Sequence, residues 1–164
     1  MKEKKFNVLI NTEMLKGIWH ITNKEIISLF KAGIIPDTIN GEPVFSWMLE
    51  NNNRQFLDNI TNEASRDELN IFLIKAVPLN DIKGAKYLIK RGAEVRSYGN
   101  LAICYSSYLG LEEMTSILIR AGADVNAENG YPIQASFEKG YTKIVDMLCE
   151  AGADIKKINN HPNR

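Results

Sequence analysis

The sequence has few of the side chains that enzymes and metal sites use, and it has no excess charge of either sign. Its two histidines, His20 and His161, are far apart, and its two cysteines, Cys104 and Cys149, lack Cys-x-x-Cys spacing. No metal site or cofactor is therefore predicted. Lys and Arg total 20, as do Asp and Glu. This balance argues against a nucleic-acid partner, because nucleic-acid binders usually carry a basic excess.

Long hydrophobic runs are also missing. The apolar run at residues 6–10 is too short for the core of a signal peptide, and no stretch approaches the length of a membrane span. We therefore expect a cytosolic protein without a membrane association, although a secretion route that needs no such signal stays open. Both cysteines fall in apolar helical patterns, so we expect reduced core thiols rather than a disulfide or a nucleophile.

The most informative feature present is an internal repeat with a period of 30 residues. The segments 91–95, 121–125 and 151–155 each contain Gly-Ala, then an acidic residue, then Val or Ile. Apolar residues at 87–89, 117–119 and 147–149 share one register. Asn80, Gly110 and Gly140 also recur at this spacing. Such a period indicates a stack of similar units rather than one globular core.

Each unit has a simple mechanical interpretation. Ile144, Val145, Met147 and Leu148 form an apolar helical stripe. Gly152 follows where a helix would end in a left-handed residue, and Gly122 and Gly92 hold the same position in earlier units. Each unit is then a turn, a helix, a tight turn and a second helix. Neither helix can bury its stripe alone, so the units must stack.

The segment 130–155 resembles one ankyrin repeat. Pro132 matches the Pro of the family's Thr-Pro-Leu-His, Gly140 matches its dividing Gly, and 152–155 matches Gly-Ala-Asp-Val. The resemblance is strong over residues 70–155 and fainter before that, where 40–44 is similar to 129–133. It implies an all-α ankyrin-repeat solenoid over residues 1–164, with about five helix–turn–helix units and short β-turn fingers. We place the units at about 11–36, 37–66, 67–96, 97–126 and 127–157, followed by a polar tail at 158–164, with second helices centred near 28, 58, 87, 117 and 147.

The sequence departs from the family's pattern in two ways. Its repeat has 30 residues where the family has about 33, and the missing residues come from the projecting finger. The family's Thr and His are replaced by Tyr131 and Gln134, and one unit earlier by Leu101 and Cys104. The hydrogen bonds that Thr and His make in the family are therefore not expected here, and the shortened fingers shift a binding surface toward the first helices.

The resemblance implies that one slot early in each first helix, and two slots before the dividing Gly, point into a concave groove. Mapped onto this sequence, the first slot holds Ser46, Lys75, Tyr105 and Ala135. The paired slots of the last three units hold Pro78 and Leu79, Tyr108 and Leu109, and Glu138 and Lys139, while Tyr98 and Tyr131 flank the same surface. We therefore predict a partner-binding surface made of Lys75, Pro78, Leu79, Tyr98, Tyr105, Tyr108, Leu109, Tyr131, Glu138 and Lys139.

Two alternatives accompany this surface. Tyr105 and Tyr108 lie three residues apart and share a helix face, so they could be a buried pair; the Lys75 in the slot equivalent to Tyr105 favours a solvated groove instead. Lys83, Lys86 and Lys90 line one face of a second helix, which we interpret as a solvated face rather than a docking patch. Trp19 and Trp47 are assigned to the core of the less regular N-terminal units.

The predicted function is that of a stand-alone protein-binding module rather than an enzyme. It would act by binding or occluding another protein, as an inhibitor, an immunity-type protein or an adaptor of bacterial or phage origin, without a small-molecule substrate. The alternative is an effector delivered into a foreign cell to bind a host protein. A remote alternative is a nucleic-acid-associated protein, based only on the basic stretch 75–96.

Overall fold

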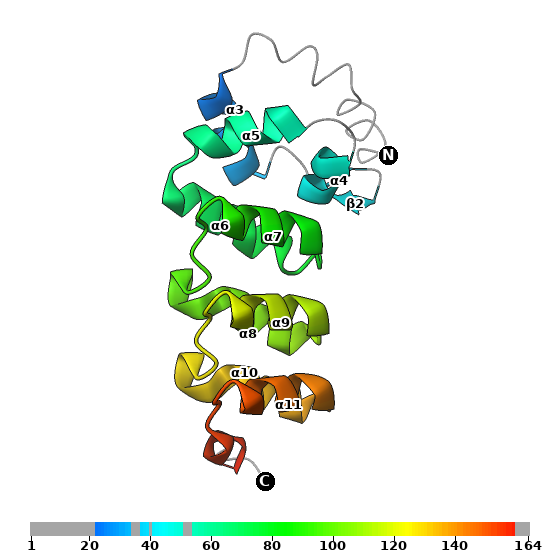
Figure 1. Ribbon diagram of the computed structural model, residues 1–164, viewed down its shortest axis with the longest axis vertical. Coiled ribbons are helices and arrows are strands. Elements are labelled where there is room, and N and C mark those ends of the chain that lie inside the picture. The colour runs from blue at the N-terminus through cyan, green and yellow to red at the C-terminus, as the bar shows by residue number, and fades with distance from the viewer. Residues whose placement is uncertain (1–21, 34–36, 40, 51–53, 160–164) are drawn as a thin grey trace.

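The computed structural model describes residues 22–33, 37–39, 41–50 and 54–159 (Figure 1). These residues form helices almost throughout, with one short pair of strands. In chain order the elements are α3 (Asn23–Lys31), β1 (Thr38–Ile39), β2 (Glu42–Pro43), α4 (Val44–Glu50), α5 (Arg54–Glu63), α6 (Arg66–Ala76), α7 (Ile82–Lys90), α8 (Ser97–Leu109), α9 (Glu112–Arg120), α10 (Ala127–Glu138), α11 (Thr142–Glu150) and the 3₁₀ helix η1 (Ile155–Asn159).

The helix pairs α6/α7, α8/α9 and α10/α11 lie one below another along the long axis of the molecule (Figure 1). First helices pack on first helices, as α8 does on α10, and second helices pack on second helices, as α9 does on α11. The N-terminal part is less regular, because α4 packs against α7 as well as α5. This architecture confirms the predicted all-α ankyrin-repeat solenoid.

The predicted centres of the second helices, at residues 28, 58, 87, 117 and 147, fall within α3, α5, α7, α9 and α11. The first helix predicted for the first unit lies outside the described residues, together with Trp19, His20 and His161. Trp47 is 8% exposed, which confirms its assignment to the core.

Left-handed residues end the second helices where the repeat predicted them. Gly92, Gly122 and Gly152 have φ of 104°, 90° and 94°. In each case the N–H of the following alanine donates to a leucine carbonyl four residues before the glycine, closing the helix end. Asn80, at φ 51°, takes the left-handed position that glycine holds at 110 and 140, since asparagine tolerates this region better than most residues.

The expected short fingers take two forms. Before α4, β1 and β2 pair as a small antiparallel hairpin, with Thr38 opposite Pro43. At the start of α8 and α10 there is instead a compact turn of three consecutive left-handed residues, at 98–100 and 128–130. Non-glycine residues in this region cost on the order of 1 kcal/mol each, so the neighbouring units must hold these turns in place. The regular part of α10 begins after Gly130, which puts Pro132 in its first turn, where proline is tolerated.

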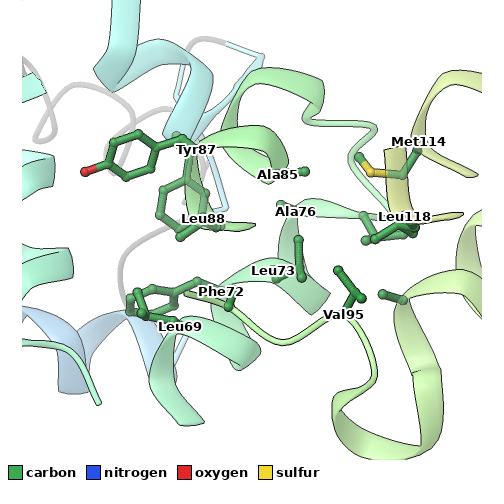
Figure 2. Close-up of a cluster of buried hydrophobic side chains, with 14 of the residues drawn as sticks. Leu69, Phe72, Leu73, Ala76, Ala85, Tyr87, Leu88, Val95, Met114 and Leu118 are labelled. Atoms are coloured by element: carbon green, nitrogen blue, oxygen red, sulfur yellow. The ribbon is translucent and has the colours of Figure 1, made fainter. Parts of the chain in front are cut away.

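Apolar side chains form one continuous core between the two helix layers and across the junctions between pairs. Figure 2 shows side chains of α6, α7 and α9 facing one another across one such junction. Those that are 0% exposed there are Phe72, Leu73, Ala85, Leu88, Met114 and Leu118. Burying one large apolar side chain contributes about 1.5–3 kcal/mol, so each pair is stabilised mainly by its neighbours.

Asparagine side chains join successive units with hydrogen bonds. The amide oxygen of Asn70 accepts the backbone N–H of Glu94 at 2.7 Å, and that of Asn100, 30 residues later, accepts the N–H of Asp124 at 3.0 Å. In the next unit this position is Gly130, and Asn126 provides the bond instead, to the N–H of Asp154 at 2.8 Å. These bonds link neighbouring turns in a chain that has lost the family's Thr and His.

Candidate partner-binding surface

Helix α8 has one strongly exposed apolar stripe. Tyr105, Tyr108 and Leu109 are 41%, 44% and 40% exposed. Their neighbours Ile103 and Ser106 are fully buried on the opposite side of the same helix. Tyr105 and Tyr108 are therefore not core residues, and the stability of the stack does not depend on burying their rings.

Next to this stripe, α8 and α10 enclose a small hollow of about 80 Å³. It is lined by Tyr108, Tyr131, Gln134, Ala135, Glu138 and Lys139. The Nζ atom of Lys139 lies 4.1 Å from the centroid of the Tyr108 ring, within the range of a cation–π interaction. The lysine therefore lies over one face of the Tyr108 ring, and Tyr108 is still 44% exposed.

Two further tyrosines flank this region. The hydroxyl of Tyr98 donates to Asp67 Oδ1 at 2.5 Å, and this bond to a carboxylate raises the pKa of Tyr98. Partial burial and then the nearby Tyr108 raise the pKa of Tyr131. Both phenols consequently keep their protons at neutral pH, so each can donate a hydrogen bond.

The structure brings the predicted surface residues together unevenly. Tyr108, Tyr131, Glu138 and Lys139 line the same hollow, and Tyr105 and Leu109 are exposed on the same helix as Tyr108. Pro78, in the turn after α6, is exposed, whereas Leu79 is half-buried.

The first groove slot is less open than the register suggested. The Nζ atom of Lys75 lies 3.1 Å from Asp37 Oδ1 and is half-buried, so this lysine is held in an ion pair rather than being a free groove residue. Ser46 bonds to Asp81, and Ala135 is 5% exposed. Local packing therefore overrides the repeat register at this slot in all the described pairs except α8/α9.

Lysines of the basic stretch 75–96 form ion pairs with acids of other units. Lysines at 75, 83 and 86 form ion pairs with acids of other elements, namely Lys75–Asp37, Lys83–Glu50 and Lys86–Glu113. Exposed pairs of this kind contribute little stability, but they neutralise three of the six basic residues in the stretch 75–96. This arrangement agrees with a solvated face and does not favour nucleic-acid docking.

The two thiols and the potential metal ligands of the described residues do not form clusters. No group of three or more His, Cys, Asp or Glu side chains in this part of the chain could hold a metal ion. Burial raises the pKa of the Cys104 thiol to about 11, so it is not a thiolate at neutral pH. Cys104 is buried and free, as predicted, whereas Cys149 is free but only half-buried, so its assignment as a core thiol was only partly correct.

Sequence reasoning missed two residues that the structure singles out. Asp81 is 1% exposed and accepts a hydrogen bond from Ser46, 35 residues earlier. No local sequence pattern predicts that pairing. Phe137 is 50% exposed on α10. The repeat register could have identified Phe137, because this aromatic residue occupies the position that Val77 and Ser107 hold in the preceding units.

No helix among the described residues is long and apolar enough to cross a membrane.

Comparisons with known proteins agree with this geometry. A search of curated proteins finds no match. The family model for ankyrin repeats, in three copies, matches residues 73–159, which is more than half of the chain. The chain therefore belongs to the ankyrin-repeat family, whose repeats serve as protein–protein interaction modules.

Proposed function

We propose that this protein acts by binding a partner protein through the tyrosine surface, which we define as Tyr98, Tyr105, Tyr108, Leu109 and Tyr131. The units at 67–96, 97–126 and 127–157 would present this surface as one rigid piece. Binding would occlude the partner's own interaction site, which is the action of an inhibitor, an immunity-type protein or an adaptor. Both cysteines are free, which suits a reducing compartment, so we place the interaction in the cytosol.

The observation that supports the proposal is the exposure of Tyr105, Tyr108 and Leu109 at 40% or more on a helix whose other side is fully buried. The stack does not need aromatic residues at positions 105 and 108, since the slots equivalent to Tyr105 hold Lys75 and Ala135 and those equivalent to Tyr108 hold Pro78 and Glu138. Tyrosine is enriched at binding hot spots because it offers a rigid apolar body and one hydroxyl.

The surface also limits the chemistry of the partner. Its centre is aromatic, and the adjoining hollow of about 80 Å³ can take only a small side chain. Glu138 and Lys139 lie on the rim of that hollow, where charges set orientation more than affinity. We therefore expect a partner that inserts one small apolar or hydroxyl-bearing side chain beside Tyr108.

The test compares three baits in affinity capture from the native lysate with mass spectrometry: the unchanged chain, Tyr105→Ala with Tyr108→Ala, and Glu112→Ala with Lys143→Ala. The control pair forms an exposed ion pair between the second helices α9 and α11, with a 3.3 Å N–O distance. A hot-spot aromatic typically costs at least about 2 kcal/mol when truncated. Losing two should weaken partner binding roughly a thousandfold, at 1.4 kcal/mol per decade.

The expected result is a partner that the unchanged chain and the control both retain and that the tyrosine variant loses, with the melting point of all three unchanged. A partner retained equally by all three baits would show that the tyrosine surface does not bind it. An unfolded tyrosine variant would contradict the exposure of these rings in the structure.

A further inference from the structure

The stack has a second exposed apolar region, at its C-terminal end and distinct from the tyrosine surface. Phe137 and Ile155 are 50% and 57% exposed, the latter being the most exposed large apolar residue of the described chain. Val145, on α11, is half-buried in the same unit. We call the surface formed by Phe137, Val145, Asp146, Ile155 and Lys156 the C-terminal end face.

The repeat register shows what covers these positions elsewhere. In the two preceding units the positions of Phe137, Val145 and Ile155 are at most 7% exposed; they are occupied by Val77, Ala85 and Val95, and by Ser107, Thr115 and Val125. The following helix pair covers them there, as α10 covers α8. The C-terminal end face is thus the side of a unit that normally packs against another unit.

The side chains at this end do not resemble a solvated cap. A unit whose outer side faces water is expected to be polar there. In the last described unit, however, Phe137 stands in the position of Ser107 and Val145 in that of Thr115, so both positions are more apolar than one unit earlier. Two large apolar residues that are half exposed or more in the same unit, Phe137 and Ile155, are typical of a surface that another molecule covers.

Two charged residues, Asp146 and Lys156, lie at two edges of the C-terminal end face. In other units the side chains at these two positions contact the following unit. Asp146 corresponds to Lys86, whose Nζ atom lies 3.1 Å from Glu113 of the next pair. Lys156 corresponds to Arg96 and Asn126, which donate to the carbonyls of the next helix end at 2.6 and 3.1 Å. Neither Asp146 nor Lys156 forms an ion pair within the described ranges.

The charged residues at these two edges have opposite signs and belong to different elements. Asp146 is on α11 and Lys156 is on η1, which packs under α10 (Figure 1). A twofold axis lying in the plane of this face exchanges its two edges. The acid of one copy then lies opposite the lysine of the other, and the apolar centres meet.

We propose that a second copy of this chain covers the C-terminal end face, giving a closed dimer joined end to end. Ile155 and Phe137 form its apolar centre, and Asp146 of each copy pairs with Lys156 of the other. The tyrosine surface of each copy stays free, so the dimer presents two partner-binding surfaces. This arrangement would raise the avidity for a partner that is itself dimeric.

The first test is sedimentation velocity of the 164-residue chain over a concentration series up to about 500 µM, with Ile155→Glu as the variant. The unchanged chain should shift reversibly from monomer to dimer, and Ile155→Glu should weaken dimerisation at least roughly thirtyfold, the value for a hot-spot residue. Leu109→Glu is the matched control, because Leu109 is an aliphatic residue 40% exposed on the tyrosine surface. It should dimerise as the unchanged chain does.

Phe137→Ser provides a second variant that should keep the fold, because it restores the residue type found at the same position one unit earlier. It should also weaken the dimer while leaving the melting point of the monomer unchanged. If Ile155→Glu fails to fold, this variant decides the question.

Charge reversal tests the twofold geometry. Asp146→Lys and Lys156→Asp should each weaken the dimer several-fold through like-charge contacts, and the two together in one chain should restore it, because each pair is then reversed as a whole. A chain that is monomeric throughout the series overturns the proposal. So do species that grow beyond a dimer, which would indicate head-to-tail stacking, and a double reversal that does not restore the dimer.

Discussion

Asp81 offers the sharpest test of how the irregular N-terminal part is attached to the regular stack. Its carboxylate is 1% exposed and accepts the backbone N–H of Gly84 at 2.8 Å, which caps α7. It also accepts the backbone N–H of Ser46 at 3.3 Å and the Ser46 hydroxyl, both from α4. A Cβ on Gly84 would lie 2.6 Å from the Cβ of Phe45, so α4 and α7 meet too closely here for any other side chain.

The change Asp81→Ala should lower the free energy of unfolding by about 3 kcal/mol. Losing the helix cap costs about 1 kcal/mol. The Ser46 hydroxyl loses a charge-assisted hydrogen bond, and such bonds contribute about 1.5–3 kcal/mol. Since small domains are stable by only about 5–15 kcal/mol, the effect should be plain in a urea or guanidinium titration.

The assay is a double-mutant cycle of Asp81→Ala with Ser46→Ala, followed by circular dichroism. Direct bonding predicts a coupling of about 1.5 kcal/mol between the two changes. Asp124→Ala is the control, because its half-buried carboxylate accepts a bond from the backbone N–H of Asn126 at 2.9 Å and lies in the regular stack. Its cost should stay below about 1 kcal/mol.

Two results would refute this reasoning. A loss of less than about 0.5 kcal/mol for Asp81→Ala would mean that water replaces the carboxylate without cost. Additive effects of Asp81→Ala and Ser46→Ala would mean that the two residues do not interact, and the junction between α4 and α7 would then depend on apolar packing alone.

Two further predictions concern the regular part of the stack. Gly122→Val should destabilise the protein by on the order of 1 kcal/mol or more, because valine is strained at a φ of 90° although space is open around the glycine; calorimetry of Ala121→Val, at an ordinary φ of −81°, is the control, and equal melting points would contradict the strain. At pH 8 a disulfide reagent should label half-buried Cys149 faster than Cys104, since a pKa of about 11 leaves only about one Cys104 thiol in a thousand ionised. Equal labelling rates in the folded protein would show that Cys104 is not protected by burial.

The regular features of this protein could be predicted from sequence because they repeat. The left-handed glycines at 92, 122 and 152 and the second helices follow from a local pattern that recurs every 30 residues. Each such feature depends on backbone preferences and on an apolar stripe within one unit. The exposure of Tyr105 and Tyr108 agrees with the predicted solvated groove, although Lys75, the residue on which that prediction rested, is half-buried in an ion pair with Asp37.

The departures from the register were decided by contacts between units. Lys75 pairs with Asp37, 38 residues away, and Ser46 bonds to Asp81, 35 residues away. The three-residue left-handed turns at 98–100 and 128–130 include Tyr98 and Glu128, residues that do not favour this conformation. The Gly and Asn residues of these turns favour the left-handed region locally, but Tyr98 and Glu128 do not, so contacts with neighbouring units, such as that of Tyr98 with Asp67, are needed to hold them.

The sequence by itself thus determined the repeat, its helix ends and the family, since these depend on spacing along the chain. Only the tertiary structure decided which equivalent positions are buried, because burial depends on whether another unit lies against them. Val77 and Ser107 are covered by the unit that follows, whereas Phe137 at the same position is half exposed where the described stack ends. A periodic sequence specifies the contacts of a unit with its neighbours, but the surface that remains open is set by where the stacking stops.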